Sequence, residues 1–277
     1  MKSILRYGPN KKFVRFSVKL SWPLMSAARK LSAYPVLKWI INPFFAYPYN
    51  EVTAIPIGVE IPQPDNVILP RAIVEHVIKQ ASEIFILDEC ICRSKCNCTN
   101  HPIDIGCMAL GKGAQRIHPS HGHKADYEEA VEHVRKAGRA GLIPTIAHVW
   151  IDPVAFGLPD FKHLMFICFC DDCCCLYRTH MRNRGPNLDK AYKGLPGISV
   201  QLDENKCNGC GICAQHCFVA AIDMVEGIPK LSDSCKSCGR CVDVCPENAL
   251  RFNLAPAEEL FDQIMTRINK VADISSV

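Results

Sequence analysis

Two runs of cysteines in the C-terminal third of the chain have a spacing that can hold metal. Residues 207–217 read CNGCGICAQHC, and residues 235–246 read CKSCGRCVDVCP. Each run follows C-x2-C-x2-C-x3-C, and the second repeats every cysteine of the first in the same order. Thiolates spaced in this way bind cubane clusters, because three on a tight loop reach one cubane while the fourth reaches its neighbour. The chemistry indicated is one-electron transfer between two adjacent clusters.

The exchange of the fourth cysteine assigns the ligands of each cluster. We expect two [4Fe-4S] clusters, with the fourth cysteine of each run at the start of a short helix. The first would be held by Cys207, Cys210, Cys213 and Cys245, and the second by Cys235, Cys238, Cys241 and Cys217. Zinc is the alternative metal for paired C-x2-C motifs, but zinc sites use two pairs separated by a longer loop.

The segment around these runs resembles a known family. Residues 197–254 are similar to the bacterial-type ferredoxin domain with two [4Fe-4S] clusters, which implies low-potential electron transfer. Phe218 departs from that family, which often has at this position the proline found at Pro246. Alternating apolar residues predict a strand over 197–202, and Glu226-Gly227 predicts the turn of a hairpin.

Ten further cysteines lie between residues 90 and 175, in two groups separated by a helix predicted over 125–144. Free thiols at this density would oxidise, and disulfides between adjacent cysteines would be strained. We therefore expect at least one additional iron–sulfur cluster with ligands from both groups. The candidates, in order, are Cys92, Cys107, Cys168, Cys170, Cys98, Cys90, Cys174 and Cys173. A zinc site or a redox-active dithiol is the alternative, and the number of upstream clusters stays open.

Residues 50–254 carry a second resemblance, to a group of iron–sulfur proteins of anaerobes. The motifs are CICR, HPIDIGCMALG, EEAVEHVRKAGRAGL and ICFCDDCCCLYR, followed by the tandem ferredoxin runs. Members tend to have Cys-Asn-Cys-Cys where this chain has Cys168-Phe169-Cys170-Asp171, so Asp171 stands where a thiolate is expected. The resemblance implies redox service in anaerobic metabolism without naming a substrate.

The remaining elements suggest how these sites are positioned. We expect an α+β protein with four parts: a basic aromatic arm (1–50), a cysteine-rich α/β domain (51–196), a dicluster ferredoxin domain (197–254) and a C-terminal amphipathic helix (255–277). Apolar residues at helical spacing in the last part favour packing against a core. Histidines at 118, 121 and 123 could bind metal, but such a run is more often a polar loop.

Charge is unevenly distributed along the chain. The first 50 residues contain nine Lys and Arg and no Asp or Glu, whereas residues 197–277 contain 7 basic and 11 acidic residues. The N-terminus lacks the apolar core and cleavage site of a signal peptide. We therefore expect reduced thiols and a cytoplasmic protein, and the acidic C-terminal domain argues against a nucleic-acid partner.

The segment 17–52 is apolar, aromatic and basic. Prolines and charges interrupt it, so a transmembrane helix is not expected. Its aromatic residues suit the core, the groove of a partner subunit, or peripheral contact with a membrane surface. We expect core or subunit contact first and membrane association second.

These features favour an iron–sulfur electron-transfer protein that relays low-potential electrons to a redox partner. The alternative is a reductase, with the upstream cysteine-rich centre as active site and the ferredoxin domain as electron inlet. No nicotinamide or flavin fingerprint supports autonomous catalysis. A regulatory cluster protein, such as an oxygen sensor, is a third hypothesis.

Overall fold

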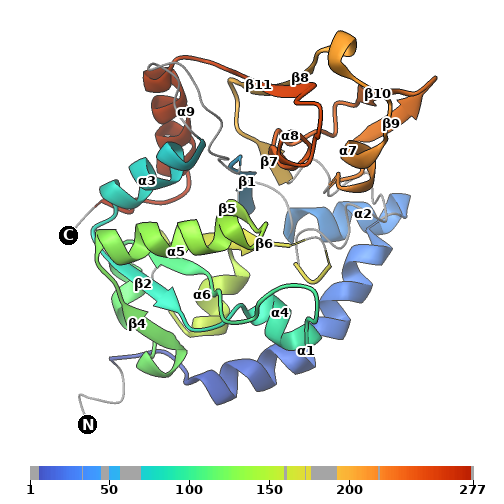
Figure 1. The fold of residues 1–277 in the computed structure, drawn as a ribbon. Helices are drawn as coiled ribbons and strands as arrows, with labels where there is room; N and C mark the ends of the chain where they lie inside the picture. The colour runs from blue at the N-terminus through green and yellow to red at the C-terminus, as the bar shows by residue number, and fades with distance from the viewer. Residues whose placement is uncertain are drawn as a thin grey trace.

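The computed structural model describes two packed parts of the chain, and Figure 1 shows them one above the other. The described residues are 6–32, 34–44, 50–56, 70–158, 161–171, 173–175, 192–217 and 219–275. Phe218, where the chain departs from the ferredoxin family, lies outside these ranges, as do residues 45–49 of the aromatic arm.

A seven-stranded sheet organises the larger part, in the order β4-β2-β3-β6-β5-β1-β7. Neighbouring strands are antiparallel except β1 and β7, which are parallel. The strands are β1 (Asn50–Ala54), β2 (Ile84–Leu87), β3 (Met108–Leu110), β4 (Gly122–Lys124), β5 (Ile143–Val149), β6 (Met165–Cys170) and β7 (Tyr192–Gly194).

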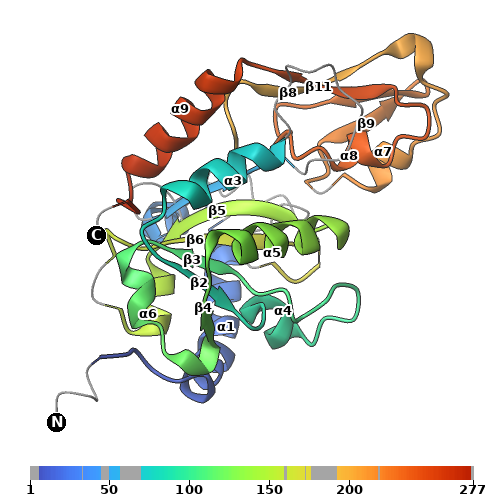
Figure 2. The same ribbon diagram turned by 60° about the vertical axis from the view of Figure 1, so that its left-hand side comes forward.

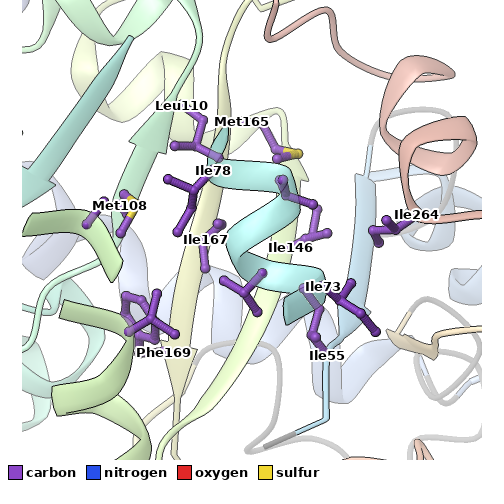
Figure 3. Packing of buried hydrophobic residues seen from close by; sticks show 14 of the residues in the cluster. Ile55, Ile73, Ile78, Met108, Leu110, Ile146, Met165, Ile167, Phe169 and Ile264 are labelled. Atoms are coloured by element: carbon purple, nitrogen blue, oxygen red, sulfur yellow. The ribbon is translucent and has the colours of Figure 1, made fainter. Parts of the chain in front are cut away.

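Alternation along the strands divides the side chains between two faces of the sheet. Ile84 and Ile86 of β2 face the core that also contains Ile167 of β6, while Phe85 and Leu87 belong to the core on the opposite face. Figure 3 shows the first of these cores, where labelled side chains from the strands meet those of the covering helices.

Three helices cover the first face: α3 (Pro70–Gln80), α5 (Tyr127–Arg139) and α9 (Ala257–Asn269). Asp126 caps α5 by accepting a hydrogen bond from the Glu129 N–H. The helix predicted over 125–144 is therefore confirmed, although it continues through Gly138 and ends at Arg139. Gly141 follows with a φ of +68°, which favours glycine.

The C-terminal helix α9 packs on the larger part even though the ferredoxin-like segment precedes it. Leu260, Ile264 and Ile268 are buried in the same core as α3 and the sheet. Figure 2 shows α9 lying beside α3. The expectation that this tail packs against a core is confirmed.

The opposite face of the sheet is covered by α1 (Lys11–Leu31), α4 (Ile91–Cys96) and α6 (Ile151–Phe156). The helix α2 (Pro35–Ile41) follows α1 along the chain. Short 3-10 turns complete the connections: η1 (Asn42–Phe44), η2 (Lys112–Arg116), η3 (Pro119–His121) and η4 (Glu204–Lys206).

The smaller part has two antiparallel strand pairs and two one-turn helices. Strands β8 (Ile198–Leu202) and β11 (Leu250–Leu254) pair, as do β9 (Ile222–Val225) and β10 (Ile228–Leu231). The helices are α7 (Ile212–Gln215) and α8 (Arg240–Asp243). Glu226 and Gly227 form the predicted hairpin turn, with φ of +50° and +78°. The expected α+β fold, with mixed helices and strands in both parts, is confirmed.

Candidate metal centres

The sequence repeat of the smaller part is also a repeat of backbone conformation. Gly211 and Gly239 occupy the position before α7 and α8, with φ of +72° and +82°. Ala220 and Asn248, also equivalent in the repeat, have φ of +51° and +49°. Positive φ at non-glycine residues costs free energy, so its recurrence indicates that both halves of the repeat adopt the same loop conformation.

The fourth cysteine of each run follows a helix, which corrects the expectation that it begins one. Cys217 comes after α7 and Cys245 after α8. Each sulfur then accepts a backbone hydrogen bond, from the Ala221 N–H at 3.2 Å and the Ala249 N–H at 3.3 Å. Such bonds stabilise a negatively charged sulfur, which a metal ligand requires.

The structure brings together the four cysteines expected to hold the first cluster. Cys207, Cys210, Cys213 and Cys245, named here the outer set, line one hollow at the surface. Cys210 is exposed, whereas Cys213 is buried. Burial raises the pKa of Cys213, and the charges of the other three thiols raise it further.

The four cysteines expected to hold the second cluster also converge. Cys217, Cys235, Cys238 and Cys241 are named here the inner set. Burial raises the pKa of Cys241, and the charges of the other three thiols act in the same direction. Cys213 of the outer set also acts on Cys241, so the two sets are neighbours.

The inner set faces the sheet of the larger part. Cys238 shares a hydrophobic core with Ala54 of β1 and Ile143 of β5, and Cys217 and Cys235 pack against it. Cys170 and Cys175 belong to the same core. The Arg240 Nη2 donates a 2.8 Å hydrogen bond to the Gly141 carbonyl, which joins the two parts beside this contact.

Comparison with known proteins agrees with this geometry. Residues 199–253 match the family of 4Fe-4S dicluster domains. The dicluster domain accounts for one part of the chain, and the expected ferredoxin resemblance is confirmed there. No solved structure matches the chain significantly.

Curated relatives share limited segments with the chain. UacF of Escherichia coli K12, a proposed oxidoreductase, is 47% identical over 58 residues, 20% of this chain and 9% of its own length. The ferredoxin-type protein FwdE of Methanocaldococcus jannaschii is 37% identical over 60 residues, 22% of this chain and 40% of its own. The ferredoxin-type protein NapH of Haemophilus influenzae is 30% identical over 123 residues, which cover 38% of this chain and 42% of NapH. The chain thus spans less than half the length of each.

Outside the dicluster domain, four thiols meet where β3 and β6 pair. Met108 lies opposite Ile167 in that antiparallel pair, so Cys107 and Cys168 follow as the next opposed residues. Interactions with Cys168 and Cys90 raise the pKa of Cys107, and interactions with Cys107 and Cys92 lower the pKa of Cys90, so the four thiols are neighbours. These residues, Cys90, Cys92, Cys107 and Cys168, are named here the four-thiol set.

A buried arginine lies beside the four-thiol set. Arg93 is fully buried, and its guanidinium donates to the carbonyls of Pro102 and Phe169 at 2.7 Å each. Burial alone would lower the pKa of Arg93, but the charges of Cys90, Cys107 and Asp171 raise it overall. A fixed cation in this position offsets the negative charge of thiolates.

Asp171 holds a loop rather than replacing a thiolate ligand. Its Oδ1 accepts backbone hydrogen bonds from Cys173 at 2.9 Å, Cys174 at 2.5 Å and Cys175 at 3.1 Å. Its Oδ2 lies 3.3 Å from Arg93 Nη1, with both side chains buried. Burial raises the pKa of Asp171, but these N–H groups and Arg93 outweigh burial and lower it.

The loop held by Asp171 presents two thiols to a third. Cys173 Sγ lies 3.3 Å from Cys98 Sγ and 3.4 Å from Cys174 Sγ. Within the described ranges, these form the group of three potential ligand atoms that all lie within 4.8 Å of one another. They are named here the three-thiol set.

The structure therefore divides the upstream candidates between two sets instead of gathering them at one shared centre. Seven of the eight fall into the four-thiol and three-thiol sets. The eighth, Cys170, instead accepts a 3.1 Å hydrogen bond from the thiol of Cys175, which the sequence did not single out. Cys96 is exposed. Arg93 and Cys175 were missed because nothing local marks them, whereas an aspartate before three consecutive cysteines is a recognisable turn signal.

The histidines of 118–123 make hydrogen bonds rather than converge on a metal. His118 Nδ1 accepts from the Ser120 N–H at 3.1 Å, His121 Nε2 donates to the Pro9 carbonyl at 3.0 Å, and His123 Nε2 lies 2.8 Å from Glu129. The interpretation as a polar loop fits these contacts.

Proposed function

We propose that this chain relays low-potential electrons through two [4Fe-4S] clusters of the dicluster domain and one additional iron–sulfur centre to a redox partner. The dicluster domain and the ferredoxin-type relatives support iron–sulfur electron transfer as the general class. The outer and inner sets would hold the two clusters, and the four-thiol set would hold the third. Clusters of this type supply one-electron carriers when bound.

One observation supports the order of the centres in this relay. The outer set opens to solvent, with Cys210 exposed, while the inner set packs into the core that contains Cys170 and Cys175. Cys168 of the four-thiol set also packs against that core. A partner docked at the outer set would thus be connected, through the inner set, with the upstream thiols.

The residues around the sets fit the role. Backbone N–H groups of Ala221, Ser237 and Ala249 donate to sulfurs of Cys217, Cys235 and Cys245. Hydrogen bonds to ligand sulfur, together with burial, are the means by which a protein sets a cluster potential. The outer set is more exposed than the inner set, so the two environments favour different potentials.

The four-thiol set fits an iron–sulfur cluster better than a single ion. Among the described residues, no three of its sulfurs all lie within 4.8 Å of one another. A [4Fe-4S] cluster binds each cysteine to a different iron and therefore needs its ligands spread. Arg93 would offset the net charge of four thiolates.

The test uses variants of the full chain purified without oxygen. Cys107→Ala should lower the iron content by about four per chain and leave the dicluster signals in a redox titration followed by electron paramagnetic resonance. Cys96→Ala, an exposed cysteine on the same segment, is the matched control and should retain all iron. Unchanged iron in Cys107→Ala would remove the third centre from the proposal.

A second candidate function is a reductase. The buried Cys170–Cys175 pair, in the same core as the inner set, is the observation that favours it. Forming a disulfide there would transfer two electrons and two protons to a substrate that is a two-electron acceptor, and two one-electron transfers from the clusters, with two protons, would restore the thiols. Coulometry tests this. On full reduction, a reductase of this kind should accept one electron for each cluster and about two further electrons for the disulfide. Cys175→Ser should lose those two further electrons.

The basic arm provides a further part of the proposal, contact with an anionic membrane surface. None of the described helices has the length and hydropathy needed to cross a bilayer. Yet the outer side of α1 exposes Phe13, Phe16, Leu20 and Leu24, which helical spacing places on one stripe. Trp39 of α2 is 83% exposed. The exposure of Trp39 excludes the core alternative for this residue of 17–52, and contact with a partner subunit stays a prediction.

The charge of α1 favours an anionic membrane surface as the occupant of this stripe. Lys12, Lys19 and Lys30 recur at spacings that return to one flank of α1, and all are exposed. The first 50 residues contain no acidic side chain that would oppose a negative surface. An apolar stripe with a lysine flank suits a lipid interface, where each lysine contributes about 1 kcal/mol.

Vesicle sedimentation tests membrane contact. The full chain should bind vesicles that contain phosphatidylglycerol and bind phosphatidylcholine vesicles less, with a loss at high salt. Leu20→Asp with Leu24→Asp should abolish binding, whereas Val225→Asp, at an exposed apolar position of β9, should not. Binding that survives the double substitution, or no binding to either vesicle, would leave the subunit groove as the explanation. The cytoplasmic location and the anaerobic setting remain predictions from the sequence.

A further inference from the structure

The three-thiol set is built more tightly than the dicluster sets. Its sulfurs lie 3.3 and 3.4 Å apart along Cys98–Cys173–Cys174, and all three lie within 4.8 Å of one another. A tetrahedral ion with metal–sulfur bonds of 2.3 Å separates its thiolates by about 3.8 Å. A cubane separates its ligands further, because each cysteine binds a different iron. The spacing therefore fits one ion and not a cluster.

Cys98 is held in position at the end of α4. It follows Asn97, which ends α4 in a left-handed conformation with φ of +49°. The Cys98 N–H donates to the Arg93 carbonyl at 3.0 Å, which fixes the loop.

The other two ligands are fixed from the opposite side. The three N–H bonds to Asp171 determine the turn that carries Cys173 and Cys174, and Arg93 pairs with Asp171. Two segments far apart in the sequence are thus joined by one buried ion pair directly behind the thiols. Such support behind ligands is typical of metal sites, where it orients the donor atoms.

We propose that Cys98, Cys173 and Cys174 bind a single thiophilic divalent cation, Zn²⁺, in a site separate from the iron–sulfur centres, with a light atom from solvent in the fourth position. Zinc accepts an all-thiolate donor set in tetrahedral geometry and undergoes no redox change. No fourth Cys, His, Asp or Glu of the described residues joins the group. Three protein ligands and an exchangeable fourth position are the arrangement of zinc sites that bind small ligands. The ligand class is therefore a small anion or a thiol.

The experiment measures zinc and iron together in the full chain, purified without oxygen from medium that contains both metals. Wild type should contain about one zinc per chain, and Cys98→Ser and Cys174→Ser should retain less than about a tenth of it. Cys96→Ser, two residues from Cys98 and exposed, should retain zinc fully. Iron should be unchanged in all three variants.

Zinc K-edge absorption then tests the coordination. Three sulfur neighbours and one oxygen or nitrogen are expected, and a thiol added in excess should convert the fourth neighbour to sulfur. Four sulfurs in the untreated protein would overturn the exchangeable position. Zinc that persists in Cys98→Ser, or wild type without zinc, would overturn the site. Loss of about four irons in Cys98→Ser would assign these thiols to a cubane. The Cys107→Ala variant separates this result from the proposed function, since it should lose iron and keep zinc.

Discussion

At the scale of single residues, the cysteine-rich domain depends on one buried ion pair. Arg93 and Asp171 are almost fully buried and lie 3.3 Å apart. Each also satisfies backbone groups, Arg93 by donating to carbonyls and Asp171 by accepting three N–H bonds. Removing one partner would leave a buried charge unpaired, which costs far more than the pair contributes by itself.

Asp171→Ala should therefore lower the free energy of unfolding by about 3–5 kcal/mol. Asp171→Asn keeps an oxygen that accepts the N–H bonds and should cost less, although it also removes the charge that pairs with Arg93. Chemical denaturation under anaerobic conditions measures both. Zinc retention should follow the same order, with Ala losing more than Asn. Equal stability of Asp171→Ala and wild type would contradict the role given to this aspartate.

Histidines in the larger part make its stability depend on pH. Burial lowers the pKa of His148, despite the hydrogen bond that its Nδ1 donates to the Leu164 carbonyl. Burial likewise lowers the pKa of His121 and His133. The unfolded chain binds more protons than the folded one below the ordinary histidine pKa of about 6.5. Stability is therefore full above that pH and is lost as the pH falls through the lowered values.

Denaturation by urea at pH 7.5 and pH 5.5 should show this loss. His148→Asn should reduce the difference between the two pH values, because one of the groups that bind protons on unfolding is removed. An identical pH difference in wild type and His148→Asn would show that His148 does not contribute.

At the scale of elements, local signals predicted most of the dicluster domain, except that its fourth cysteines follow a helix instead of beginning one, and they were insufficient upstream. The spacing of its cysteines, the strand at 197–202 and the turn at Glu226-Gly227 are encoded within short windows, and the structure contains all three. The upstream partition depends instead on the register of β3 with β6, which opposes Met108 to Ile167. The pairing of distant strands is not encoded in short windows of sequence. The candidate cysteines could therefore be predicted, but not which of them lie together.

The helix α9 illustrates the same limit. Its apolar spacing predicted an amphipathic helix, but the partner, α3 and the sheet of the larger part, came from the structure. Ile264→Ala should lower the free energy of unfolding by about 2–5 kcal/mol, since its side chain is fully buried. Thr266→Ala, an exposed position on the same helix, should change it little. Similar effects of the two substitutions would contradict the packing of α9 on this core.

At the scale of the whole molecule, the chain places its thiols in a sequence of neighbouring sites. The outer set faces solvent, the inner set faces the core with Cys170 and Cys175, and the four-thiol set continues from Cys168. Arg93 and Asp171 then separate the four-thiol set from the three-thiol set. The proposed relay would use this order, with the exposed outer set at one end and the upstream thiols at the other, on a scaffold whose basic arm exposes an apolar stripe.

The metal content of the full chain, purified without oxygen, tests the central claim most directly. Separate upstream centres predict about 12 iron, about 12 acid-labile sulfide and about one zinc per chain. About 8 iron and no zinc would confine metal to the dicluster domain and contradict both upstream centres. A folded protein without iron would contradict the whole account.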